Sequence, residues 1–290
     1  MDTSNILKFQ FENLWFNPNS RFEESIKHIK ECYQDSDSFF AANKFTNFLL
    51  NILTAKNSQS LAAKLFSAID AMEELNLSIN LSFMYLYKSS YDSLRRALEI
   101  TVLGQFYESV EDNPETAFNW IKSKTDTPRF NKMVTKLSTN ETFGVIDSKF
   151  EWKTNLLNHY WNLCDFCHTK GYEKSIVNLN QKSILKPDIN PQVLDLFVSN
   201  YIATVQQIAM IYTVQNPILI VGLPTFEKFG LESKGLFSNE QADNLKSILP
   251  DSYRSYLINV IDNNETIQNR INEIKNLPDS EFYLSFKANK

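Results

Sequence analysis

The stretch INLSFMYLYKSSYDSLRRALEITVLGQFYES, residues 79–109, decides the fold. Its apolar residues recur at intervals of three and four, which places them on one face of an α-helix. Gly104 is the first glycine of the chain, and the long glycine-free stretch before it favours long helices over turn-rich β structure. We therefore predict one long helix here, with an apolar stripe made of Met84, Tyr87, Tyr91, Leu94, Leu98 and Val102.

Two kinds of helix-start signal recur along the chain. One is the spacing of a capping box, in which a serine precedes a glutamate or glutamine by three residues. The other is a capping side chain just before a proline suited to the first helical position. The capping boxes begin at Ser20, Ser148 and Ser238, and the prolines follow Asn113, Thr127 and Asn190. The predicted helices lie near residues 21–34, 38–55, 59–76, 79–109, 114–123, 128–137, 149–168, 191–216, 239–249 and 252–277.

These elements predict an all-α protein, a multi-helix bundle with long antiparallel helices. Residues 59–216 form the expected central bundle, with a helical extension at 1–58 and a helical cap at 238–290. Residues 217–237 contain two prolines and three glycines, which favours an ordered loop over a short strand at ILIVGL. No repeat or flexible linker separates the segments, so we expect one structural domain.

Bulk composition indicates a soluble, globular protein. The 290 residues are 43% hydrophobic and 22% charged, and the net charge of −5 disfavours a broad nucleic-acid footprint while leaving room for a local basic pocket. The N-terminus lacks the basic and apolar regions of a secretory signal, and the most apolar stretch, 193–214, carries too many polar residues for a membrane span. Three cysteines without an export signal indicate free thiols in a reducing cytoplasm.

Potential chemistry is concentrated in HYWNLCDFCH, residues 159–168. The string Cys164-x-x-Cys167-His168 is compatible with haem attachment, with zinc binding or with plain core packing. On a helical wheel both cysteines lie at the centre of the apolar face, and a zinc site would need a fourth ligand from elsewhere in the fold. We therefore favour core thiols and predict no metal and no cofactor. His168 lies on the flank of that face, as a structural hydrogen-bonding group or a functional one.

Arg95 borders the apolar stripe of the 79–109 helix. An arginine in that position needs a partner or a function. Its partners would be Glu99 one turn ahead or Asp92 one turn behind, whereas Arg96 points nearly opposite the stripe and should be solvated. Aromatic residues at helical spacing nearby could stack on nucleotide bases, although core packing is the commoner role. They are Tyr87, Tyr91, Tyr160 and Trp161.

Together, the two helices resemble bacterial all-helical proteins related to the HEPN (higher eukaryotes and prokaryotes nucleotide-binding) superfamily. An L-R-x-x-L-E-I helix is followed by a helix that ends in L-x-x-x-x-H-T. The resemblance covers about residues 60–215, and most matching positions are apolar helix positions. The matching residues are Leu94, Arg95, Leu98, Glu99, Ile100, Tyr160, Leu163, Asp165, Phe166, His168 and Thr169.

The resemblance implies a helical bundle, frequently dimeric, of the kind found in phage defence, abortive infection and toxin–antitoxin systems. Active members of that family are metal-independent RNases that use Arg and His from an R-x4–6-H motif. This chain departs from the motif, because the residues at that spacing before His168 are Leu163, Asn162 and Trp161. Arg95 would have to replace the missing arginine from the neighbouring helix.

Two functional hypotheses follow. The first is a HEPN-like bacterial defence or toxin-type protein, a homo-oligomer that acts on RNA or a nucleotide, with His168, Arg95 and Glu99 as catalytic residues and Tyr91, Tyr160 and Thr169 as substrate contacts. The alternative is a non-catalytic helical scaffold or sensor that binds a protein partner. The enzyme requires Arg95 and His168 in one open cleft, whereas the scaffold requires both to be buried and paired, with an apolar patch elsewhere.

Overall fold

The structure is a computed structural model that describes residues 18–33, 37–52, 58–110, 114–168, 170–171, 174, 190–231 and 235–288. Across these ranges the chain forms helices and no strands, which confirms the all-α prediction. One isolated parallel bridge joins Gly222 to Phe237. In the same described ranges, no helix has the length and hydropathy needed to cross a membrane.

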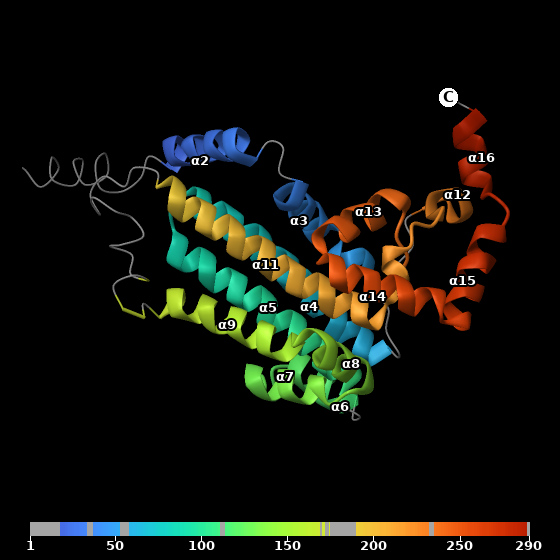
Figure 1. Cartoon of the computed structure of the whole chain (residues 1–290), viewed down its shortest axis with the longest axis horizontal. Helices are drawn as coiled ribbons and strands as arrows, with labels where there is room; N and C mark the ends of the chain where they lie inside the picture. Colours follow the sequence, from blue (N-terminus) through green and yellow to red (C-terminus); the bar gives the residue numbers. More distant parts are fainter. Residues whose placement is uncertain are drawn as a thin grey trace, which may run out of the picture.

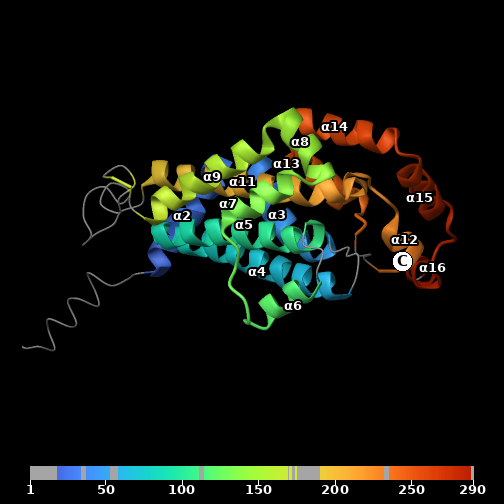
Figure 2. The same ribbon diagram turned by 90° about the horizontal axis from the view of Figure 1, so that it is seen from below.

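Three long helices lie side by side through the middle of the molecule (Figure 1). They are α4 (Ser58–Phe83), α5 (Tyr87–Ser109) and α11 (Pro191–Gln215). The central one is α5, which packs against α4, α7, α9 and α11, so more than half of its residues are buried. Figure 2 shows α4 along the outer edge of the bundle, with α6 beyond it.

Shorter helices surround this centre. On one side, α6 (Pro114–Ile121), α7 (Phe130–Ser138), α8 (Glu141–Phe150) and α9 (Trp152–Cys167) follow one another. The N-terminal part contributes α2 (Pro18–Tyr33), α3 (Asp37–Phe48) and the 3-10 turn η1 (Leu49–Ile52). The C-terminal part contributes η2 (Pro217–Ile220), α12 (Thr225–Phe229), α13 (Asn239–Ile248), α14 (Asp251–Asp262), α15 (Glu265–Asn276) and α16 (Glu281–Ala288). Buried side chains from Ile29 to Ile274 form one continuous core.

Small residues bring α4 and α5 into close contact. The hydroxyl of Ser90 donates to the carbonyl of Ser78 at 2.9 Å, and Gly104 lies so near Ser67 that a Cβ at Gly104 would be 2.1 Å from the Ser67 hydroxyl oxygen. The order of these two contacts along the chain shows that α4 and α5 run antiparallel. Ala97 lies seven residues from both Ser90 and Gly104, on the same face of α5.

The predicted single helix over 79–109 is wrong, because α4 continues to Phe83 and α5 begins at Tyr87. Between them Tyr85 adopts a left-handed backbone with φ of 63°. No glycine or proline marks this turn, and such a conformation is unfavourable for tyrosine. Tertiary contacts stabilise it, because the Tyr85 side chain is buried and its hydroxyl donates to Glu24 Oε2 at 3.0 Å.

The predicted helix over 252–277 is likewise two helices. It is interrupted at Asn263–Asn264, where the Asn264 side chain accepts a hydrogen bond from the backbone N–H of Ile267 and so caps α15. Helix α8 (Glu141–Phe150) was not predicted. In the 217–237 segment, the predicted loop contains η2 and α12, and residues 232–234 lie outside the described ranges.

The helix-start predictions have mixed outcomes. The capping box of Ser238 with Gln241 is present, and Pro191 begins α11. The box predicted at Ser148 is wrong, because α8 runs on to Phe150, and Glu151 then turns the chain with φ of 51°. The carboxylate of Asp147 accepts a hydrogen bond from the backbone N–H of Lys153 in the first turn of α9. Pro114 likewise begins α6 as predicted. Two starts differ, because Ser20 lies inside α2 and α7 begins two residues after Pro128.

Candidate functional site

The candidate site lies where α5 packs against α9. Arg95 donates to Asp92 Oδ1 at 3.0 Å, to Glu99 Oε2 at 2.8 Å and to the hydroxyl of Tyr160 on α9 at 3.4 Å. Both predicted carboxylate pairs are therefore confirmed. The Arg95 side chain keeps 21% of its surface exposed. Burial opposes its charge, but the hydrogen bonds to Tyr160 and Asp92 and the charge of Glu99 outweigh burial and raise the pKa of the guanidinium.

Aromatic stacking fixes the surroundings of Arg95. The ring of Tyr160 stacks on Phe130 of α7, with ring centroids 3.8 Å apart. Tyr91 is fully buried and stacks on Phe166 of α9 at 4.0 Å. A ring with both faces inside the core offers nothing to a nucleotide, so Tyr91 packs α5 against α9 in this structure and does not line an open site.

The two cysteines of α9 face the core, as their helical spacing predicts. Cys164 and Cys167 are free thiols, and both are buried. Burial raises the pKa of both thiols, that of Cys167 to about 11, against the opposing charge of Arg95. Thiols in this state are poor nucleophiles and poor metal ligands at neutral pH. Among the residues that the structure describes, no three His, Cys, Asp or Glu side chains are arranged to hold a metal ion.

His168 and His159 have opposite environments. His168 ends α9, where its backbone N–H donates to the carbonyl of Cys164 at 2.9 Å, and its side chain is exposed. The hydrogen-bond partners of Arg95 are Asp92, Glu99 and Tyr160, and His168 is not one of them. Arg95 is therefore paired, as the scaffold hypothesis requires, but the expectation that His168 is buried as well is wrong. His159 faces α11 instead, with Nε2 2.8 Å from the hydroxyl oxygen of Thr204. Thr169, a predicted substrate contact, lies outside the described residues.

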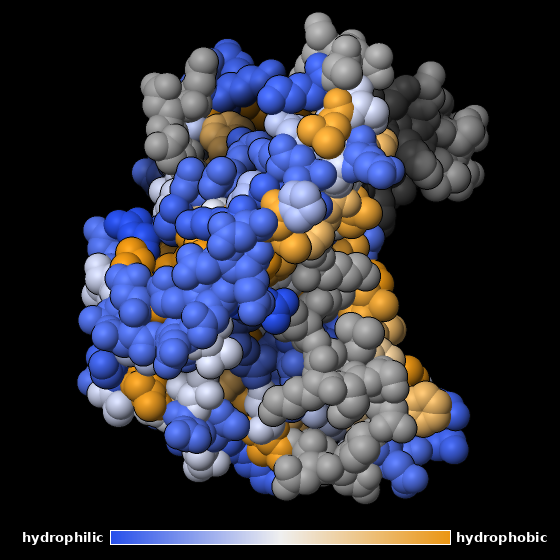
Figure 3. Space-filling view, turned by 90° about the vertical axis from the view of Figure 1, so that its right-hand side faces the viewer, coloured by the Kyte–Doolittle hydropathy of each residue, from blue (hydrophilic) through white to orange (hydrophobic). Residues whose placement is uncertain are grey.

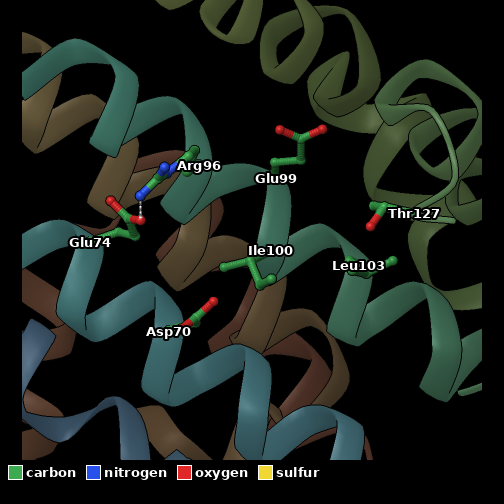
Figure 4. Close-up of a pocket in the computed structure, with 7 residues that line it drawn as sticks. All are labelled: Asp70, Glu74, Arg96, Glu99, Ile100, Leu103 and Thr127. Atoms are coloured by element: carbon green, nitrogen blue, oxygen red, sulfur yellow. Dashed lines mark hydrogen bonds and ion pairs between the residues drawn. The ribbon is translucent and has the colours of Figure 1, made fainter. Parts of the chain in front are cut away.

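A pocket of about 550 Å³ opens on the other flank of Glu99, between α4 and α5. Figure 4 shows Arg96 of α5 and Glu74 of α4 joined by an ion pair at one end of this pocket. The helical wheel predicts a solvated Arg96, but only half of its side chain is exposed and the rest lies against α4. The pocket is lined by Asp70, Glu74, Arg96, Glu99, Ile100, Leu103 and Thr127.

Sequence reasoning missed this pocket. The carboxylates Asp70 and Glu74 lie four residues apart on α4, and four residues also separate Glu99 from Leu103 on α5. Residues four apart lie on the same face of a helix, so the sequence indicates which residues of each helix lie together. It does not indicate that these two faces meet, and the pocket forms only where α4 packs against α5.

Comparison with known proteins identifies no relative of this chain. No family model, no curated protein and no solved structure matches this chain. The resemblance to HEPN-like proteins therefore rests on the helix pattern of the sequence alone.

Proposed function

We propose that this chain is a HEPN-like, non-catalytic helical module that binds a protein partner through the outer face of α4. One observation carries the proposal: Phe66, Ile69 and Leu77 are 46%, 40% and 43% exposed on that face, where one edge of the Phe66 ring packs against Trp120 of α6. Their spacing puts them on one stripe of the helix, about 17 Å long at 1.5 Å per residue. A row of large apolar side chains along one helix face is typical of a docking surface for another helix.

The environment of Arg95 supports binding over catalysis. An RNase would use this guanidinium against the negative charge that develops on phosphate. Here the guanidinium of Arg95 already forms ion pairs with Asp92 and Glu99, and these carboxylates repel an incoming phosphate. A phosphate would have to displace two hydrogen-bonded carboxylates from a side chain that is mostly covered.

Selection from an unbiased library of displayed helical peptides tests the proposal. The wild-type chain should enrich peptides whose binding is lost in Leu77→Ser. Leu284→Ser is the matched control, because Leu284 is also exposed but lies on α16. Both substitutions remove exposed side chains, so the unfolding free energy should change by no more than about 0.5 kcal/mol. Enrichment of no peptide, or of peptides that bind Leu77→Ser as well as wild type, would refute the proposal.

A metal-independent RNase is the second candidate, and one observation favours it. The exposed His168 directly follows Cys167, and the charges of Arg95 and Asp92 act on the thiol of Cys167. An exposed imidazole is the side chain most often used as a general base in catalysis.

Cleavage assays on single-stranded RNA with a chelator present separate the two candidates. We expect no cleavage that depends on His168 or Arg95, because Arg95 is neutralised by its two carboxylates. The variants are His168→Ala and Arg95→Ala, with Arg96→Ala as the control for loss of a neighbouring guanidinium. Cleavage by wild type and Arg96→Ala that disappears in the other two variants would establish the RNase instead.

A further inference from the structure

The docking stripe of α4 is bordered by negative charge. Asp70, Glu73 and Glu74 alternate along the helix with the exposed apolar residues, and Asp70 and Glu74 lie on the flank that faces α5. On α5, Asp92 and Glu99 continue the acidic surface. Only two cations, Arg95 and Arg96, form ion pairs with these carboxylates in the described part of the chain, so the surface keeps a net negative charge.

Two of these carboxylates are incompletely paired. Asp70 forms no ion pair among the described residues. Burial raises its pKa, and so do the charges of Glu74 and Glu73, against the opposing effect of Arg96. Glu74 gives one oxygen to Arg96, but its other oxygen, Oε2, is buried without a hydrogen-bond partner in the described structure. An added cation would relieve the repulsion around Asp70 and could satisfy Glu74.

The shape of the pocket fits a long cationic side chain. Ile100 and Leu103 provide an apolar wall, and the carboxylates of Asp70, Glu74 and Glu99 lie around it (Figure 4). Arginine and lysine combine an apolar stem with a charged head, so the stem can cover the apolar wall while the head reaches the carboxylates. The planar guanidinium of arginine also matches a carboxylate with two parallel hydrogen bonds.

A second copy of this chain is a poor occupant of the same surface. In a twofold dimer the same patch meets itself, so an α4–α4 contact would place Asp70, Glu73 and Glu74 of one subunit against the same residues of the other. Like charges facing each other across an interface are unfavourable. The apolar stripe alone would permit a dimer, and the carboxylates beside it disfavour one.

We propose that the outer face of α4 binds a basic amphipathic helix, whose apolar residues cover Phe66, Ile69 and Leu77 and one of whose arginine or lysine side chains enters the pocket between α4 and α5. This inference rests on the proposed function and names the chemical class of the partner. Apolar burial along about three helical turns supplies affinity, and charge complementarity sets the choice of partner and its orientation.

Fluorescence anisotropy with three synthetic peptides of about 18 residues, roughly 27 Å as helices, tests the inference on the full chain. The first peptide has a leucine stripe flanked by arginines. The second carries glutamate in place of every arginine, and the third carries serine in place of every leucine. Only the first should bind tightly, and its affinity should fall with salt because the surface charges are screened.

Protein variants locate the binding site. Leu77→Ser should weaken binding of the first peptide about tenfold, as expected for loss of one buried leucine contact. Asp70→Asn should weaken it by about two- to fivefold, in the range of an exposed charge pair. The matched controls are Leu284→Ser on α16 and Glu240→Gln on α13, and both should bind as wild type does.

Three results would overturn the inference. Equal binding of the arginine and glutamate peptides would show that charge does not select the partner. Equal binding by Leu77→Ser and Leu284→Ser would place the peptide elsewhere. A dimer in sedimentation velocity that dissociates in Leu77→Ser would identify a second copy as the occupant. The library selection distinguishes failure of this inference from failure of the proposed function. If it enriches neutral or acidic peptides whose binding requires Leu77, the chain is still a docking module, but its partner is not a basic helix.

Discussion

Replacing Lys64 with methionine should lower the free energy of unfolding by about 3–5 kcal/mol. Lys64 lies on α4 and pairs with Glu108 of α5, with Nζ and Oε2 2.6 Å apart. Their side chains are only 2% and 6% exposed. Methionine keeps the length and apolar stem of lysine but removes the charge, so it would leave the Glu108 carboxylate buried without its cation.

The surroundings of this pair offer little compensation. Burial raises the pKa of the Tyr212 hydroxyl on α11, and the charge of Glu108 raises it further. The buried carboxylate therefore already acts on its neighbours, and removal of Lys64 would leave that charge unbalanced.

Urea denaturation followed by circular dichroism measures this effect. The control is the double variant Lys64→Met/Glu108→Leu, which removes both charges and should recover most of the lost stability, because an apolar pair of similar volume often replaces a buried ion pair at little cost. If the single variant is as stable as the double one, Glu108 is not held as a buried carboxylate, and the prediction fails.

Acidification should also destabilise the protein, and His159 should account for a large part of the loss between about pH 6.5 and pH 4.5. Burial lowers the pKa of His159 to about 4, whereas the unfolded chain titrates near the ordinary value of about 6.5. The unfolded state therefore binds the proton first as the pH falls. The stabilisation is fully present above the unfolded pKa and is lost as the pH falls toward the folded pKa.

Burial keeps His159 neutral in the fold, and hydrogen bonding fixes its tautomer. The hydroxyl of Thr204 donates its only proton to the carbonyl of Asn200 at 2.8 Å, so its oxygen must accept from His159. Nε2 of His159 then carries the proton of the neutral ring. Protonation of the other ring nitrogen, Nδ1, would place a positive charge against α11. The resulting loss in the free energy of unfolding should be about 2–3 kcal/mol after allowance for the partial exposure of His159.

Denaturation midpoints at several pH values test this prediction. His159→Gln keeps a hydrogen-bond donor for Thr204 but cannot titrate, so its stability should depend less on pH across this window. His168→Gln serves as the control because His168 is exposed, and it should keep the wild-type pH dependence. A wild-type slope in His159→Gln would show that other groups cause the acid sensitivity.

Local patterns in the sequence were sufficient for the fold class and for the Arg95 pairs. The stripe residues Tyr91, Leu94 and Leu98 are all buried, because helical periodicity records which face meets the core. Arg95 contacts Asp92 and Glu99 within its own helix, and such pairs follow from spacing alone.

Features that depend on contacts between helices could not be predicted. The turns at Tyr85 and Glu151 use left-handed backbone without glycine, so no local signal marks them. The Lys64–Glu108 pair and the ion pair between Glu74 and Arg96 each join α4 to α5. Their partners are set by the register of one helix against the other, which a single sequence does not record.

The close packing of α4 against α5 also bears on how this chain can evolve. A larger side chain at Ser90, Ala97 or Gly104 would push the two helices apart, and at Gly104 even a methyl group meets Ser67. Lineages that share this fold should therefore accept substitutions freely at the exposed positions of α4 and very rarely at these three. We expect a small residue at every seventh position of α5 to be retained in related chains after most other sequence similarity has been lost.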